Sequence, residues 1–206
     1  MSTDKREHII TTAMKLFAEK GFEGTSIRDI ASEADVNIAM VNYYFGSKEK
    51  LFEGMVEHKS LFMREKLDEI ANDKTTTEIE KVDLVIEYYV EMFLSHPDYH
   101  RLIQMELLLK SREEIHDKLI ANFVKNTHIV KGIIEQGIRK KQFKKVDAEL
   151  TFASLVGTIS QLISKKMCFM IMMDKEKDFD PLADTQFKKR LITHLKQIIH
   201  SHLLIK

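Results

Sequence analysis

Residues that interrupt or cross-link a polypeptide are scarce in this chain. Its 206 residues include one cysteine, two prolines and seven glycines. The single thiol, Cys168, excludes a disulfide within the chain and any cysteine-rich metal site. Because breakers are so few, while leucine, isoleucine, lysine, glutamate and methionine occur throughout, the composition predicts an almost entirely helical protein.

Long apolar segments are also missing. The longest uninterrupted run, from Met167 to Met173, is much too short to cross a bilayer, and the first residues lack the apolar core of a secretory signal. We therefore expect a cytoplasmic protein with no membrane partner. The length allows one large or two small domains with a real core.

Neither sign of charge is in excess. The chain has 32 basic and 32 acidic side chains, and residues 1–50 contain seven basic and eight acidic groups. Composition alone would therefore not identify a nucleic-acid-binding segment. Since only the docking face of such a protein has to be positive, an assignment depends on the residue pattern.

The first helix is expected over about residues 4–20, where apolar residues recur at helical spacing and Gly21 is a suitable stop. A second helix is expected over about residues 25–34. Ser26, followed three residues later by Asp29, forms a capping-box pattern at its start.

A tight turn at residues 34–37 leads into a short third helix, expected from about Ile38 to Tyr44 and capped by Asn37. Two short helices joined by such a turn, with a supporting helix before them, are typical of the helix-turn-helix that binds DNA. The pattern therefore predicts a DNA-binding domain at the start of the chain.

A polar segment near residues 72–77 marks the expected domain boundary. The helix-turn-helix domain is expected to cover residues 1–50, with a connector helix over 47–72, and an effector-binding and dimerisation domain to cover 75–206. Further helical patterns cover about residues 77–95, 97–110, 112–142, 146–173 and 184–204. The predicted fold class is all-α, with about nine helices.

The outward positions of the short helices are the candidate DNA contacts. A recognition helix enters a major groove about 12 Å wide, so its outward residues should be small or polar, as Asn37, Ala39 and Asn42 are. The hydroxyls of Thr25 and Ser26 would extend a helix N-terminus toward phosphates. Tyr43 and Lys48 flank the third helix, where the two backbones of the duplex should pass.

Two segments resemble the corresponding parts of TetR/AcrR-type bacterial regulators: residues 21–31, GFEGTSIRDIA, and residues 36–52, VNIAMVNYYFGSKEKLF. The resemblance covers roughly residues 5–55, and the combined string is highly specific. The rest of the chain resembles this family only in length and helical content. Membership would imply a DNA-binding transcription regulator.

The resemblance also implies roles for single residues. It implies phosphate contacts by Ser26, Tyr43 and Lys48, and groove-facing positions at Arg28, Ile38, Ala39, Met40 and Asn42. Two positions depart from the common pattern: Asp35 replaces a glycine of the turn, and Asn42 stands where many members have an aromatic residue. Asp tolerates a positive φ better than most residues. The Asn42 contact would move from a phosphate to a base edge.

No motif in the second domain identifies an effector. We expect a cavity among the helices of residues 80–165, lined by aromatic surface with a few polar anchors. The candidates are Tyr88, Tyr89, Phe93, Gln104, Phe123, Thr127, His128, Phe152 and Gln161. Most of these should prove to be core residues, because an aromatic or apolar stripe at helical spacing is usually core.

A symmetric homodimer would present two recognition helices to half-sites about 34–36 Å apart. The last two helices are the expected interface. The candidate contacts are Leu150, Ala153, Val156, Gly157 and Ser160 on one helix, and Leu191, Leu195, Ile198 and Ile199 on the other.

The predicted function is that of a repressor bound to palindromic operator DNA and released by an unidentified small hydrophobic molecule. The alternative keeps the DNA-binding head but makes the helical body a platform for protein interactions in nucleoid organisation or cell division. No glycine-rich phosphate loop, HExxH motif or nucleophile elbow is present, so we expect no enzyme activity, no cofactor and no metal.

Overall fold

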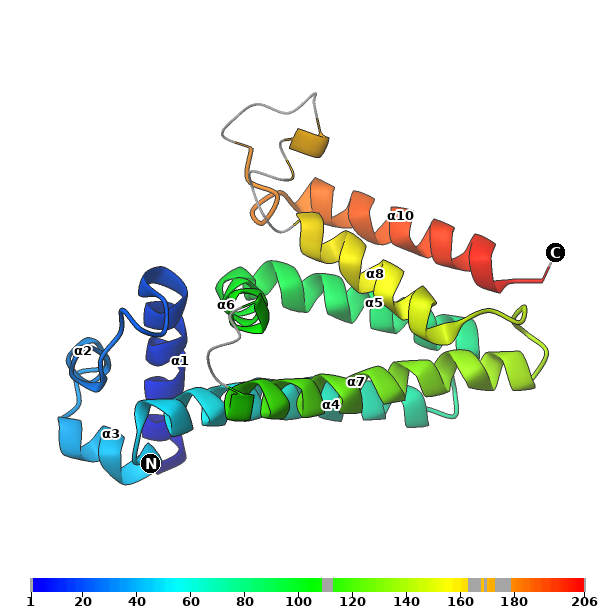
Figure 1. Cartoon of the computed structure of the whole chain (residues 1–206). Helices are drawn as coiled ribbons and strands as arrows, with labels where there is room; N and C mark the ends of the chain where they lie inside the picture. Colours follow the sequence, from blue (N-terminus) through cyan, green and yellow to red (C-terminus); the bar gives the residue numbers. More distant parts are fainter. Residues whose placement is uncertain (1, 109–112, 163–167, 169, 173–178, 206) are drawn as a thin grey trace. The chain divides into compact units, whose positions relative to one another are not determined.

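The computed structural model describes residues 2–108, 113–162, 168, 170–172 and 179–205 (Figure 1). These residues form nine α-helices and one isolated β-bridge, between Phe143 and Leu204. The predicted all-α class is confirmed. Within the same residues, every helix is too short or too polar to pass through a lipid bilayer.

The helices follow the predicted order. They are α1 (Ser2–Lys20), α2 (Ile27–Glu33), α3 (Ile38–Phe45), α4 (Lys48–Asn72), α5 (Glu78–Ser95), α6 (Pro97–Leu108), α7 (Glu113–Arg139), α8 (Ala148–Leu162) and α10 (Thr185–Leu203). The helix expected over 146–173 is found as far as Leu162, and the one expected over 97–110 as far as Leu108. Residues 109–112, 163–167, 169 and 173 lie outside the described part of the chain.

Helix α7 ends at Arg139, three residues before the predicted end at Gln142. Lys141 adopts a positive φ of 57°. The amides of Gln142 and Phe143 both donate to the carbonyl of Gly137, over 2.9 and 3.2 Å. This left-handed turn ends the helix and folds the Phe143 ring back over Gly137, where a Cβ would lie 2.2 Å from the ring.

The chain packs as two compact units. Unit 1 contains residues 1–63 and 98–124, and unit 2 contains residues 64–97 and 125–206. This division by packing differs from the functional domains expected over 1–50 and 75–206, and those domains remain a prediction.

The core of unit 1 holds the short helices α2 and α3 in place. Three phenylalanine rings form its centre: Phe17 of α1, Phe22 of the following loop and Phe52 of α4 lie 5.2–5.6 Å apart, centroid to centroid. Ile30 of α2 and Val41 of α3 are fully buried in the same cluster. Each such side chain stabilises the fold by roughly 1.5–3 kcal/mol.

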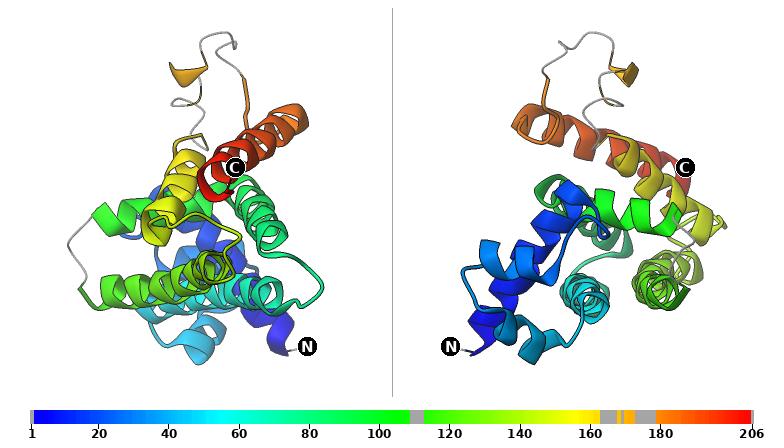
Figure 2. Two further views of the ribbon diagram at one scale, coloured as in Figure 1. Left: turned by 90° about the vertical axis from the view of Figure 1, so that its right-hand side faces the viewer. Right: turned by 60° about the vertical axis from the view of Figure 1, so that its left-hand side comes forward.

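The core of unit 2 forms where α5 packs against both α8 and α10 (Figures 1 and 2). Leu191, Leu195 and Ile199 of α10 are buried here, with 2–5 % of their surface exposed. The expectation that these three residues contact a second subunit is therefore wrong, because their stripe completes the core of their own subunit. Ile198 of the same predicted stripe points outward, with 51 % exposed.

Candidate nucleic-acid interface and effector cavities

The start of α2 is fixed by the predicted capping box. The amide of Asp29 donates to Ser26 Oγ over 3.1 Å, and the Ser26 amide and hydroxyl donate to Asp29 Oδ2 over 2.9 and 2.6 Å. The Ser26 hydroxyl, followed by the Ser26 amide, lowers the pKa of the Asp29 carboxyl. The box thus holds a very short helix at a defined first residue.

The turn between α2 and α3 uses a left-handed residue, as the sequence predicted. Asp35 has a φ of 50°, and the amide of Val36 donates to the carbonyl of Ala31 over 3.0 Å. Asn37 then caps α3, its Oδ1 accepting from the amide of Met40 over 2.7 Å. Gly46, at a φ of 77°, ends the helix. Helix α3 is therefore a short rod with fixed ends.

The outward faces of these helices carry most of the predicted DNA contacts. Val41 and Phe45 bury one side of α3 in the core of unit 1. The exposed candidates are Ser26, Arg28, Asn37, Ile38, Ala39, Asn42 and Tyr43. Tyr43 stands out with 85 % of its surface exposed, whereas Met40 is half-buried against the core. This distribution leaves a side of α3 accessible to a groove.

Thr25 does not belong to this exposed set. Its side chain is 1 % exposed, and its hydroxyl donates to the carbonyls of Gly21 and Leu16 over 2.8 and 3.2 Å. The expected DNA contact by this side chain is corrected accordingly. Thr25 instead ties the loop before α2 to the end of α1.

Lys48 is a cation in a fixed position. Its Nζ donates to the carbonyl of Phe22 over 2.9 Å, lies 4.3 Å from the centre of the Phe22 ring and approaches Glu23 Oε2 at 3.9 Å. These contacts leave 20 % of the side chain exposed. The ammonium is pre-oriented by a carbonyl and an aromatic face, and its contact with phosphate remains a prediction.

The nine candidate effector contacts are divided between the two units, and a cavity shared by all of them remains a prediction. Gln104 and Phe123 belong to unit 1, and the other seven belong to unit 2. Tyr89, Phe93 and Phe152 are core residues, with 4–9 % exposed, and the rings of Tyr89 and Phe152 meet edge to face at 5.3 Å. Tyr88 and Gln161 each line a cavity, and the other candidates of unit 2 line neither of these two cavities.

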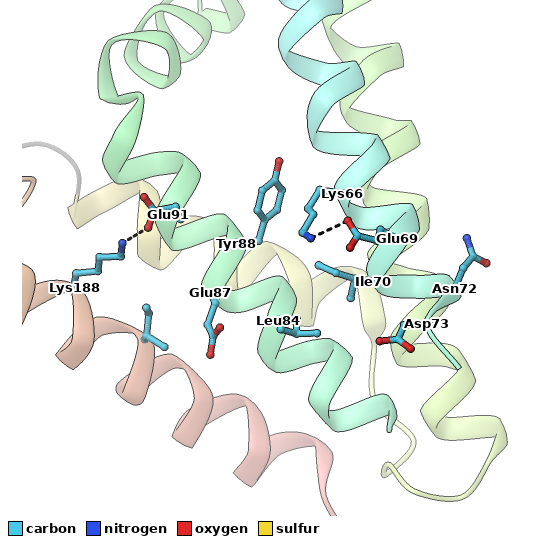
Figure 3. A pocket seen from close by; sticks show the side chains of 11 residues that line it. Lys66, Glu69, Ile70, Asn72, Asp73, Leu84, Glu87, Tyr88, Glu91 and Lys188 are labelled. Carbon is cyan, nitrogen blue, oxygen red and sulfur yellow. Dashed lines mark hydrogen bonds and ion pairs between the residues drawn. The ribbon is translucent and has the colours of Figure 1, made fainter. Parts of the chain in front are cut away.

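An open groove of about 850 Å³ lies between the end of α4, α5 and the start of α10 (Figure 3). Tyr88 projects from α5 toward Lys66 of α4, and its Oη is buried without a hydrogen-bond partner among the described residues. Burial raises the pKa of Tyr88 to about 12. Lys66 pairs with Glu69 over 2.8 Å. We call this space the Tyr88 groove. The sequence pattern predicts only a connector helix for the α4 residues that line it, and no ligand contact.

A second cavity, of about 270 Å³, lies between the end of α8, residues 171–172 and α10. Gln161 of α8 is the one predicted effector contact that lines it. We call it the Arg190 pocket, after the guanidinium at its rim. Neither cavity contains a metal cluster, since no group of three or more His, Cys, Asp or Glu side chains is arranged to hold an ion in the described chain.

Together, capped α2, the left-handed turn and exposed α3 define a helix-turn-helix. The family model for bacterial regulatory proteins of the tetR family matches residues 9–55. A second family model, for the tetracyclin repressor-like C-terminal domain, matches residues 75–164. The chain belongs to the TetR family of bacterial transcription regulators.

Individual relatives are similar over much of the chain. The transcriptional repressor NicS of Pseudomonas putida is 31 % identical over 68 % of this chain and 66 % of its own length. The fatty acid metabolism regulator protein of Bacillus subtilis is 25 % identical over 88 % of this chain and 91 % of its own. The crystal structure of FadR from Bacillus subtilis in complex with stearoyl-CoA covers 92 % of this chain and 96 % of its own, with 23 % identity and a TM-score of 0.70. That structural likeness shows the shared fold.

Proposed function

We propose that this protein is a homodimeric repressor that binds a palindromic operator and is released by a small molecule with an apolar chain. The observation that supports it is the exposed side of α3, braced by Val41 and Phe45 and fixed at both ends. A rod of this kind can enter a major groove without rearranging the core behind it.

Exposed apolar residues on the last two helices favour pairing of two subunits. Leu150 of α8 is 67 % exposed, close in sequence to the small residues Ala153 and Gly157, and Ile198 of α10 is 51 % exposed. Large apolar side chains on one surface are typical of a protein interface. A two-fold axis through this surface would supply the two recognition helices that a palindrome requires.

The Tyr88 groove is the proposed effector site. It contains apolar side chains, Ile70, Leu84 and Ile192, and a buried hydroxyl that lacks a partner within the described residues. Its α4 residues belong to the same continuous helix that begins at Lys48, beside the end of α3. A ligand that moves this end of α4 would thereby change the presentation of α3, and the names of two relatives favour a fatty acyl compound.

The DNA-binding proposal is tested on operator fragments selected from the source genome. Arg28→Ala and Asn42→Ala should weaken binding and relax base preference, since both side chains are exposed beside the proposed groove contact. Lys48→Ala should weaken binding to all fragments and reduce the salt-dependence slope by about one. Arg139→Ala on α7 is the matched control. If the protein does not bind genomic fragments even in dilute salt, the proposal is wrong.

The effector proposal is tested by adding acyl-CoAs, free fatty acids and neutral lipophiles to the DNA complex. An effector should raise the melting temperature of the free protein and release the fragment. Tyr88→Phe should weaken its binding, because it removes the groove's buried hydroxyl. If no compound changes either readout while DNA binding is intact, the helical body is better explained as a protein-interaction platform.

A further inference from the structure

The turn between α2 and α3 is tied to α1 by a histidine side chain. The Nε2 atom of His8, on α1, lies 3.2 Å from the carbonyl oxygen of Ala34, the residue that caps the end of α2. A carbonyl oxygen can only accept a hydrogen bond, so the ring nitrogen is the donor and carries the proton. A side chain 26 positions earlier in the sequence therefore holds the peptide that leads into the turn.

Two further carbonyls near the end of α2 are bonded within the turn itself. The amide of Val36 donates to the carbonyl of Ala31 over 3.0 Å. The amide of Asp35 donates to the carbonyl of Ser32 over 3.3 Å. The last carbonyls of a helix have no partner inside that helix. The backbone of the turn supplies the donors for these two, whereas the donor for the third is the imidazole of α1.

The peptide that His8 holds comes directly before the left-handed residue of the turn. Its carbonyl belongs to Ala34, at a ψ of 0°, and its nitrogen belongs to Asp35, at a φ of 50°. These two torsions set the direction in which the chain leaves α2. Because α3 begins soon afterwards, at Ile38, a rotation of this peptide would change the angle between the two helices.

A second contact from α1 reaches the same end of α2. Lys15 pairs with Glu33 over 3.6 Å, and both side chains are more than half exposed. His8 and Lys15 are spaced by two helical turns, so they lie on the same face of α1. An exposed ion pair contributes little and has no fixed geometry. The hydrogen bond of His8 is directional and is therefore the contact that orients the peptide.

We propose that His8 is a positioning residue for DNA recognition: its imidazole fixes the turn, and the turn sets the angle at which α3 enters the major groove. This inference deepens the proposed function and rests on it, since it requires α3 to read the operator. Contacts with base edges depend on the placement of α3, whereas attraction of cations to phosphates is independent of base sequence. Loss of the bond should therefore reduce discrimination between sequences more than general attraction to DNA.

The experiment compares the full-length parent with His8→Ala, His8→Gln and Thr11→Ala. Each protein is titrated with an operator fragment selected from the source genome and with a scrambled fragment of the same length. His8→Ala should weaken operator binding about tenfold, as loss of a base contact does. Its binding to the scrambled fragment should change less than about twofold. His8→Gln should restore most of the discrimination, because a glutamine amide can donate in place of Nε2. Thr11→Ala, at an exposed position of α1, is the control and should bind both fragments as the parent does.

Two measurements on the free protein separate positioning from a loss of stability. The melting temperature of His8→Ala should stay close to that of the parent, since one exposed hydrogen bond adds little net stability. The NMR amide signals of Asp35 and Val36 should move in His8→Ala and return toward the parent positions in His8→Gln. Unchanged amide signals would contradict the proposed role. A large fall in melting temperature with discrimination intact would make His8 a stabilising residue only.

The DNA titrations can overturn the assignment in three ways: equal operator affinity in His8→Ala and the parent, no recovery of discrimination in His8→Gln, or a parallel loss on both fragments with a smaller salt-dependence slope. The last result would make His8 a direct phosphate contact. If the parent binds no genomic fragment, the proposed function and this assignment both fail. If the parent binds its operator and His8→Ala binds equally well, only the role of His8 is wrong.

Discussion

The two compact units use polar side chains in different ways. In unit 1 these groups fix the ends of helices: Ser26 and Asp29 cap α2, Asn37 caps α3, and Thr25 anchors the loop before them. In unit 2 they also cap helices, with Thr77 and Glu80 at α5 and Asp184 at α10, and in addition the carboxylates of α5 pair with a row of cations on α10.

Helix length explains why the caps should matter more in unit 1. Helices α2 and α3 have seven and eight residues, whereas α5 and α10 have 18 and 19. A helix of two turns is unstable alone and leaves a large share of its backbone groups unsatisfied, so a cap decides whether it forms. A long helix depends mainly on its packed face, so a cap contributes a smaller share of its stability.

The largest expected effect tests whether apolar packing, and not charge, holds α5 and α10 together. Leu195→Ala removes a side chain that is 2 % exposed between them and should cost about 2–5 kcal/mol. Chemical denaturation measures this loss. Ile198→Ala on the outward face of α10 is the control, and an equal loss there would contradict the assigned faces.

The next effect separates anchoring from DNA contact at Thr25. Thr25→Val keeps the shape but removes the hydroxyl that donates to Gly21 and Leu16. Unit 1 should lose about 1–3 kcal/mol, because one buried and one partly buried carbonyl lose their donor. Urea denaturation measures the anchoring role of Thr25, and operator titration measures a role in DNA binding. A variant of normal stability that fails to bind DNA would show that the Thr25 hydroxyl contacts DNA after all.

A smaller effect is expected from the cap of α2. Ser26→Ala should destabilise the protein by about 1 kcal/mol, since the amide of Asp29 loses its acceptor at the start of α2. Thermal denaturation measures it, and Ser32→Ala within the same helix is the control. If the two variants are equally stable, capping does not limit this helix.

The ion pairs of α5 and α10 should contribute less still. Glu87→Gln breaks the contact with Lys196, in which the carboxylate is 47 % exposed, and should cost no more than about 1 kcal/mol. The loss should shrink in high salt. If Glu87→Gln lowers the free energy of unfolding as much as Leu195→Ala does, charge contributes as much as packing to holding α5 and α10 together.

The smallest effect is the contribution of Asp29 to the pH dependence of unit 1. The pKa of Asp29 is lowered from its ordinary value of 3.8 by the Ser26 hydroxyl. Its stabilising contribution is therefore complete above pH 3.8 and is lost as the pH falls through the lower folded-state value. Carboxyl titration by NMR should show a low Asp29 pKa that returns toward 3.8 in Ser26→Ala, and an unchanged pKa would disprove the assigned cause.

The fold of unit 1 was predictable because its signals are local. The Ser26–Asp29 spacing, the Asn37 cap and Gly46 each act within one helical turn, so they can be recognised without knowing what packs behind. Thr25 shows the limit of such signals. A hydroxyl next to a helix start can bind a phosphate or a carbonyl, and only the position of Leu16 decides between them.

The cavities of unit 2 were less predictable because they depend on distant segments. The stripe on α10 showed that one face is buried but not whether α5 or a second subunit covers it. Similarly, Tyr88 and Tyr89 are neighbours in sequence, yet one borders a groove and the other lies in the core.

The inward stripe of α10 has a consequence for assembly. Within a single subunit, water has almost no access to Leu191, Leu195 and Ile199. A monomer therefore needs no second subunit to bury this stripe. Association of two copies and folding of each copy would then be separate equilibria, and dilution should produce folded monomers. Below the dissociation constant of the dimer, the midpoint of thermal denaturation should accordingly stop changing with protein concentration, unlike that of a dimer whose subunits fold only together.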